Sequence, residues 1–143
     1  MTSRNLVLLA ALFGFVGVAA GAFGAHGLTA YFAAHPDLED TFRTATQYEL
    51  YHTLALIGAA WAVERWPGRW ARWSGGLFAA GIVLFSGSLY LLSLLNLPIL
   101  GIITPFGGLA FLAGWICLGV AAWQNNAAGS KPPARENKRS EDR

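Results

Sequence analysis

Residues 44–63 read TATQYELYHTLALIGAAWAV, and the interpretation of the whole chain starts from this stretch. It has the length of a membrane span, because about 20 mostly apolar residues cross about 30 Å of hydrocarbon. Yet it carries Glu49 and His52, two side chains that hydrocarbon tolerates poorly. Helical spacing places both on the side that holds Phe42 and Leu56. The pattern predicts that Glu49 and His52 point into a bundle of helices.

The composition of the whole chain favours a membrane protein. Of 143 residues, 55% are hydrophobic and 13% are charged, and the mean hydropathy is +0.43. Soluble domains carry about 25% charged residues. Three further stretches, 6–25, 77–95 and 99–123, have the length of a membrane span and hold no charged residue. Together with a helix over 37–63, they predict an all-α membrane protein, a four-helix transmembrane bundle over residues 1–124.

The two ends of the chain differ in character. A signal peptide also begins with a basic residue and an apolar core, but that core runs for only about 7 to 15 residues. The apolar run 6–25 is longer, so we expect a helix that is retained. Residues 125–143, NNAAGSKPPARENKRSEDR, are polar and lack helical periodicity, which predicts a disordered charged tail.

Glycines form a stripe on the first predicted helix. Gly14, Gly17, Gly21 and Gly24 recur at spacings of three and four, so they share one face. In lipid, close approach of backbones holds helices together. We expect this face to pack against another helix of the same chain, and a seam between two copies is the alternative.

The connections carry punctuating residues. Gly27 is predicted to end the first helix in the left-handed conformation, and Pro36 to begin the second. Gly107 and Gly108, after Pro105, either loosen the start of the last helix or let it pack closely.

The segment ERWPGRWARW, residues 64–73, alternates aromatic and basic side chains. It is predicted to lie in the membrane interface, with indoles at headgroup depth and guanidinium groups on anionic lipid headgroups. A solvated turn is the alternative. The interface residues are Arg65, Trp66, Arg69, Trp70, Arg72 and Trp73.

Positive charge predicts the orientation. Four crossings put the amino terminus, residues 64–73 and the tail on one side, with all ten Lys and Arg residues except Arg43. An excess of Lys and Arg marks cytoplasmic loops, so both termini are predicted to be cytoplasmic. The formal net charge of +2 lies in the tail and offers no nucleic-acid surface.

Polar residues of all four predicted helices come to one level in the outer half of the bundle. Glu49 and His52, at i and i+3, can share a proton or form an ion pair. Two interpretations stay open: a structural clasp between His26 and Glu49, or a site that binds a small ligand or passes protons. The candidate residues are His26, Gln47, Tyr48, Glu49, His52, Ser86, Ser88 and Thr104.

Catalysis is the least favoured function. Cys117 is the only cysteine, so no intramolecular disulfide or cysteine cluster can form. A di-iron site is disfavoured because it needs more carboxylates. Haem ligation by His26 and His52 is disfavoured because nothing in the sequence marks space for a porphyrin. No catalytic residue, metal or cofactor is predicted.

Four ordered motifs resemble a known family of small four-helix membrane proteins, typified by the bacterial YgdD and YwdK proteins, with a mitochondrial relative in animals. They are GAFGAHGL at 21–28, FRTATQYELYHTLAL at 42–56, LFSGSLYLL at 84–92 and LGIITPFGGLAFLAGW at 100–115. The proline-bearing segment 64–73 departs from the family pattern, and the charged tail is an extension. The resemblance implies a multipass protein of the bacterial inner membrane and supplies no reaction.

Two functions follow as hypotheses. The first is an interaction protein that associates with a larger membrane complex or forms a homo-oligomer through its glycine face and basic side. The alternative is binding or transport of a proton, small solute or lipid-soluble ligand through His26, Glu49 and His52.

Overall fold

The computed structural model describes residues 1–129, with side chains described as far as Asn125, and all regular structure in that range is helical. In chain order the elements are α1 (Ser3–His26), α2 (Thr29–Ala34), α3 (Pro36–Arg65), α4 (Arg69–Gly81), the π-helix η1 (Ile82–Ser86), α5 (Gly87–Leu95), the 3-10 helix η2 (Pro98–Ile102) and α6 (Thr104–Gly129). From α4 through η1 to α5 the helix continues without a break, so these three elements form one rod.

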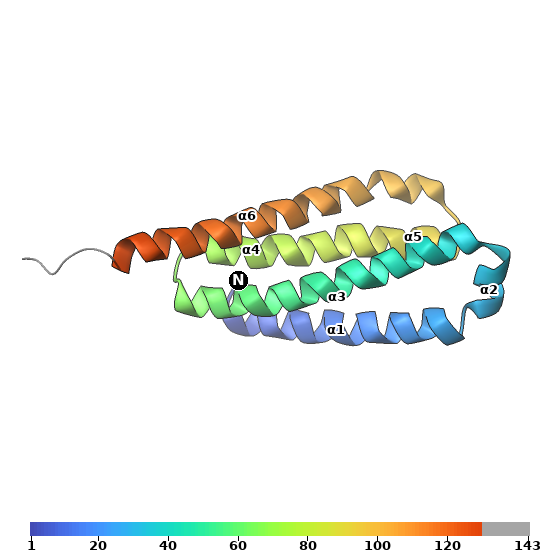
Figure 1. Cartoon of the computed structure of the whole chain (residues 1–143), viewed down its shortest axis with the longest axis horizontal. Coiled ribbons are helices and arrows are strands. Elements are labelled where there is room, and N and C mark those ends of the chain that lie inside the picture. The colour runs from blue at the N-terminus through green and yellow to red at the C-terminus, as the bar shows by residue number, and fades with distance from the viewer. Residues whose placement is uncertain (130–143) are drawn as a thin grey trace, which may run out of the picture.

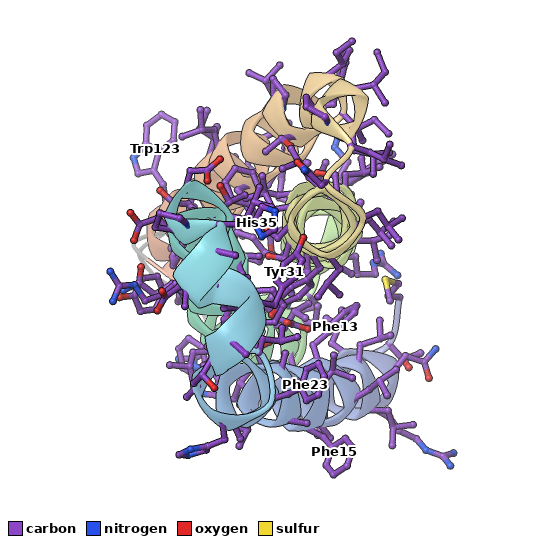
Figure 2. The ribbon with its side chains drawn as sticks, turned by 90° about the vertical axis from the view of Figure 1, so that its right-hand side faces the viewer. Phe13, Phe15, Phe23, Tyr31, His35 and Trp123 are labelled. Atoms are coloured by element: carbon purple, nitrogen blue, oxygen red, sulfur yellow. The ribbon has the colours of Figure 1, made fainter. Side chains whose placement is uncertain are left out.

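Four long rods lie side by side in an up-and-down order (Figure 1). The start of α1, the turn between α3 and α4, and the end of α6 lie at one end, and α2 lies at the other. Seen from the α2 end, α1 and α6 lie on opposite sides of the molecule (Figure 2). Between them, α3 packs on α1 and on the α4–η1–α5 rod, and α6 packs mainly on α4 and η1. Two rods are therefore central and two are peripheral.

The central position of α3 explains how a fairly polar helix is accommodated. Among the described residues, three helical runs are long and apolar enough to cross a membrane by length and composition: Ser3–His26, Arg69–Leu95 and Pro98–Asn125. The helix α3 is not among these three runs. Length and composition therefore support three of the four predicted spans and do not support the span predicted over residues 37–63. Instead, neighbouring helices cover one face of α3, so the polar side chains on that face can bond within the protein.

The main core draws on all four rods. Leu6 of α1, Leu56 of α3, Phe78 of α4 and Phe111 of α6 are almost fully buried in one cluster. Because lipid is as apolar as these side chains, their close packing supplies the attraction that holds the rods together.

The turn between α3 and α4 corrects the predicted interfacial segment. A proline disfavours helix at the residue before it, and Trp66, which precedes Pro67, has φ −127° and ψ 77°. A new helix begins at Arg69, not near residue 77 as predicted. Residues 69–73 are thus the first turn of a long rod, not a separate segment along the interface.

The connection between α1 and α3 holds two further findings. Pro36 begins α3 as predicted, with Asp37 and Glu39 in its first turn. The prediction for Gly27 is wrong, since its φ of −88° is right-handed. A Cβ atom at Gly27 would lie 2.6 Å from the exposed Phe23 ring, so a larger residue there requires that ring to shift.

The other end also differs from the prediction. The last helix, α6, continues past Trp123 to Gly129, so the predicted tail boundary at residue 125 lies inside it. The rest of the predicted tail, residues 130–143, lies outside the described residues.

The glycine stripe of α1 lies against α3. A Cβ atom at Gly14 or Gly21 would be 3.4 Å from a threonine methyl group of α3, which is ordinary contact. At Gly17 it would lie 2.9 Å from Leu50 Cδ2, and at Gly24 2.7 Å from the Phe42 ring. This interface therefore sets small residues of one helix against side-chain ends of the other.

The contact between α6 and the α4–η1–α5 rod uses glycines from both partners. A Cβ atom at Gly81 would lie 2.4 Å from the Phe111 ring, and one at Gly114 would lie 2.7 Å from the Phe78 ring. At Gly107 it would lie 2.4 Å from the backbone nitrogen of Phe85, which belongs to η1. A π-helix widens one turn, and Gly107 leaves room for that widened backbone.

Candidate functional site

Glu49 lies between α1 and α5, with 2% of its surface exposed. The Tyr90 hydroxyl donates to Glu49 Oε2 at 2.6 Å and lies 3.2 Å from the hydroxyl oxygen of Thr46. On the α1 side Gly17 lies beside the carboxyl group, and a Cβ atom there would come within 3.4 Å of the carboxyl carbon. A buried carboxyl group is costly unless it is hydrogen-bonded, and Tyr90 supplies that bond.

His52 has both ring nitrogens engaged. Nδ1 lies 2.8 Å from the Tyr48 carbonyl oxygen, which can only accept, so Nδ1 carries the proton. The Trp115 indole donates to Nε2 at 3.4 Å. The ring also stacks on Phe111, with centroids 3.4 Å apart and planes inclined by 10°. This arrangement holds a neutral imidazole in one tautomer and leaves it no free lone pair for a metal.

Glu49 and His52 do not bond to each other, in contrast to the predicted proton sharing or ion pair. Glu49 bonds towards α5, whereas His52 bonds towards α6. Among the described side chains, the one ion pair joins Arg43 and Asp40, which are both exposed. One helical turn therefore separates two independent polar contacts that tie α3 to different neighbours.

Three predicted site residues lie at the edge of this region. His26 is exposed at the end of α1 and makes no hydrogen bond within residues 1–125, so the predicted clasp between His26 and Glu49 is absent there. Gln47 is exposed as well. Tyr48 keeps 40% of its surface exposed while its ring stacks on Phe85, with centroids 4.6 Å apart. A site formed jointly by His26, Glu49 and His52 is thus not assembled.

A third polar contact connects α5 to α6. The Ser88 hydroxyl donates to the Phe85 carbonyl oxygen at 3.0 Å, so Thr104, 2.8 Å away, donates to Ser88. Thr104 is the first residue of α6, and the bond fixes the start of that helix. Ser86 and Thr53 are different: their buried hydroxyl oxygens have no partner within the described residues.

The connection α2 is fastened to the same end of the molecule. Tyr31 points between α2 and α5 (Figure 2), and its hydroxyl donates to the Ser93 carbonyl oxygen at 2.9 Å. His35 stacks on Tyr31 with ring centroids 4.8 Å apart. At the end of the bundle that carries the predicted polar level, a hydrogen bond therefore connects α2 to α5.

Sequence reasoning missed the partners of the two central residues. Tyr90 and Trp115, which bond Glu49 and His52, were not among the predicted site residues. Both lie inside the motifs LFSGSLYLL and LGIITPFGGLAFLAGW quoted above, so the polar-capable side chains of those motifs were the available signal. Within the described residues, no group of three or more His, Cys, Asp or Glu side chains could hold a metal.

Fold and site define a small multipass helical membrane protein in which hydrogen bonds of Glu49, His52 and Ser88 connect the helices. The sequence profile of a family described as a protein of unknown function (DUF423) matches residues 20–108, and the chain belongs to this family. The predicted resemblance is therefore confirmed. The family description assigns no activity.

Individual relatives agree with this assignment. The inner membrane protein YgdD of Escherichia coli is 45% identical over 122 residues, which cover 85% of this chain and 92% of YgdD. The membrane protein YwdK of Bacillus subtilis is 44% identical over 121 residues, covering 83% of this chain and 96% of YwdK. The membrane protein SAB0533 of Staphylococcus aureus is 42% identical over 123 residues, covering 85% and 97%. No solved structure matches the chain.

Proposed function

We propose that α3 crosses the membrane together with the three apolar rods, so that the chain spans a bacterial inner membrane four times with both termini in the cytoplasm. The proposal is supported by the up-and-down order of rods, since α3 runs beside α1 and the α4–η1–α5 rod (Figure 1). A helix packed between spanning helices spans with them. The excess of Lys and Arg at one end favours the cytoplasmic side for the termini.

A reporter enzyme fused after Arg143 tests this orientation. It should be active in the cytoplasm and inactive outside the cell. A second fusion in the α2 connection, after Ala34, should give the opposite result. Activity of the Arg143 fusion only outside the cell would refute the orientation, and equal location of both fusions would refute the crossing by α3.

We propose further that this bundle acts as an interaction protein, an accessory subunit of a larger membrane complex. The supporting observation is that the buried polar groups are used internally: Glu49 bonds Tyr90, His52 bonds Trp115, and Ser88 bonds Thr104. Such bonds connect helices and engage Glu49 Oε2 and both ring nitrogens of His52 within the protein. The arrangement favours a rigid scaffold over a transport path.

The peripheral helices supply the surface for association. On α1, Phe15 points away from the bundle and is 75% exposed, and on α6 Trp123 is 76% exposed (Figure 2). Leu12 of α1 and Leu112 and Ile116 of α6 are also more than half exposed. In a bilayer such faces meet either lipid or helices of a partner, and small residues beside them permit close packing.

Quantitative capture from native membranes in mild detergent tests the role. The full chain should recover one stoichiometric membrane partner. Two double variants are compared, Leu12→Ala with Phe15→Ala on the outer face of α1, and Leu112→Ala with Ile116→Ala on that of α6. At least one of them should lose the partner. Tyr51→Phe is the matched control, since Tyr51 is exposed on α3. Recovery of the chain alone every time would overturn the proposal.

A further inference from the structure

Two neighbouring hollows lie at the end of the molecule that carries the turn between α3 and α4. The larger, of about 380 Å³, is an open apolar groove between α3 and α6, lined by Gly58, Trp61, Trp66, Trp115, Leu118 and Gly119. The smaller, of about 170 Å³, lies between that turn and the last turns of α6, and Arg69, Gln124 and Asn125 line it. Trp66 forms a wall of both hollows, so they follow one another along α6.

The larger hollow, here called the tryptophan groove, is suited to an aliphatic chain. Its volume falls in the range of about 300 to 1,000 Å³ that ligand sites occupy. A Cβ atom added at Gly58 or Gly119 would meet nothing within 4 Å, so the floor of the groove is open. The indole nitrogen of Trp115 is already bonded to His52, so the groove receives the apolar surface of this side chain.

The smaller hollow, here called the arginine hollow, is suited to an anion. It lies at the start of α4, whose first turn has no acidic residue and no side-chain cap, so its free backbone N–H groups favour negative charge. Arg69 lies there with its guanidinium 5.2 Å from the Trp70 ring and no carboxylate partner among the described side chains. The sequence near the turn has an excess of positive charge. Residues 60–129 contain one acidic residue, Glu64, and three basic residues, Arg65, Arg69 and Arg72.

We propose that the two hollows bind one anionic phospholipid, with an acyl chain in the tryptophan groove and the phosphate in the arginine hollow. The apolar groove and the cationic hollow follow one another in the order of tail and headgroup. The inference rests on the proposed orientation, which places this end of the molecule in the cytoplasmic leaflet, where anionic lipids attract basic residues. It specifies a single site, beyond general contacts of interfacial arginines with headgroups.

Tryptophan quenching by lipids brominated in the acyl chain tests the site. The full-length protein is placed in phosphatidylcholine vesicles with a rising fraction of brominated phosphatidylglycerol or brominated phosphatidylcholine. We expect half-maximal quenching at about fivefold lower fraction of phosphatidylglycerol, the contribution of about one arginine contact. Arg69→Gln should abolish this preference. Arg4→Gln, which removes an exposed positive charge at the same end of the molecule, should retain the preference for phosphatidylglycerol.

Two substitutions test the groove from opposite walls. Gly119→Leu on α6 and Gly58→Leu on α3 should each raise the lipid fraction needed for quenching, because the new side chain fills the groove. Gly87→Leu is the matched control, since a Cβ atom there also meets nothing within 4 Å but lies outside the groove. If one groove variant does not fold, the other decides the result.

The proposal is overturned if wild-type protein responds equally to both lipids, or if the folded groove variants behave as wild type. Its failure is separable from failure of the orientation. The Arg143 reporter fusion reports which side the site faces, whereas quenching in symmetric vesicles reports the site on either side.

Discussion

The two peripheral helices are attached in different ways. On α1, Gly17 faces the movable end of the Leu50 side chain of α3, whereas on α6 Gly107 faces the backbone of η1. A side-chain end can shift by a few tenths of an ångström, but the backbone of a packed helix cannot. Gly14 and Gly17 on α1 are therefore expected to tolerate substitution better than Gly107 on α6. The four predictions below test this difference, in order of decreasing effect.

Gly107→Ala should have the largest effect. The added Cβ atom would lie 2.4 Å from the Phe85 backbone nitrogen, so the two helices must separate. We expect the free energy of unfolding to fall by about 3 kcal/mol, the upper range for overpacking. Unfolding in mixed micelles with rising dodecyl sulfate, followed by circular dichroism, measures it. Gly108→Ala is the control, because its Cβ atom would lie 3.8 Å from Phe85 and should cost little.

Gly114→Ala should have the next largest effect. Its Cβ atom would lie 2.7 Å from the ring of Phe78, which is fully buried and cannot swing aside. A loss of about 2 kcal/mol is expected in the same unfolding assay. Adding Phe78→Leu should recover part of that loss by making room. A double variant no more stable than Gly114→Ala would show that the ring is not the obstacle.

Tyr90→Phe tests the bond behind the α1 interface. The substitution removes the hydroxyl that donates to Glu49, and a buried acceptor without its donor costs about 1 to 3 kcal/mol. We expect a loss of about 1.5 kcal/mol in the free energy of unfolding. Tyr51→Phe, at a side chain 58% exposed, should be neutral. Adding Glu49→Leu should restore stability, and a further loss instead would mean that Glu49 has another partner.

Gly17 and Gly14 of the α1 stripe should give the smallest effects. Gly17→Ala would bring a Cβ atom within 2.9 Å of the half-buried Leu50, whose end can rotate away, so a loss below about 1 kcal/mol is expected. Gly14→Ala, at 3.4 Å from Thr53, should stay within about 0.5 kcal/mol of wild type. If Gly17→Ala cost as much as Gly107→Ala, the proposed difference between the two interfaces would be wrong.

Periodicity and composition were sufficient for the parts of the fold that depend on a single helix. The apolar runs, the start of α3 at Pro36 and the burial of Glu49 and His52 follow from spacing along one segment. Errors arose where two local signals competed. Pro67 ended one helix, but the arginines and tryptophans after it belong to the next helix, since an aromatic and basic pattern fits the end of a span as well as an interfacial segment.

The amino-acid sequence by itself determined where each polar residue lies along its helix, because that position is a distance along one helix. It left open which neighbour each of them meets, because that depends on how the helices rotate about their axes and which of them adjoin. Glu49 and His52, three residues apart, therefore looked like one pair, while packing of α3 between α1, the α4–η1–α5 rod and α6 gives Glu49 to Tyr90 and His52 to Trp115. Contacts between helices are a property of the assembled bundle, and no single helix encodes them.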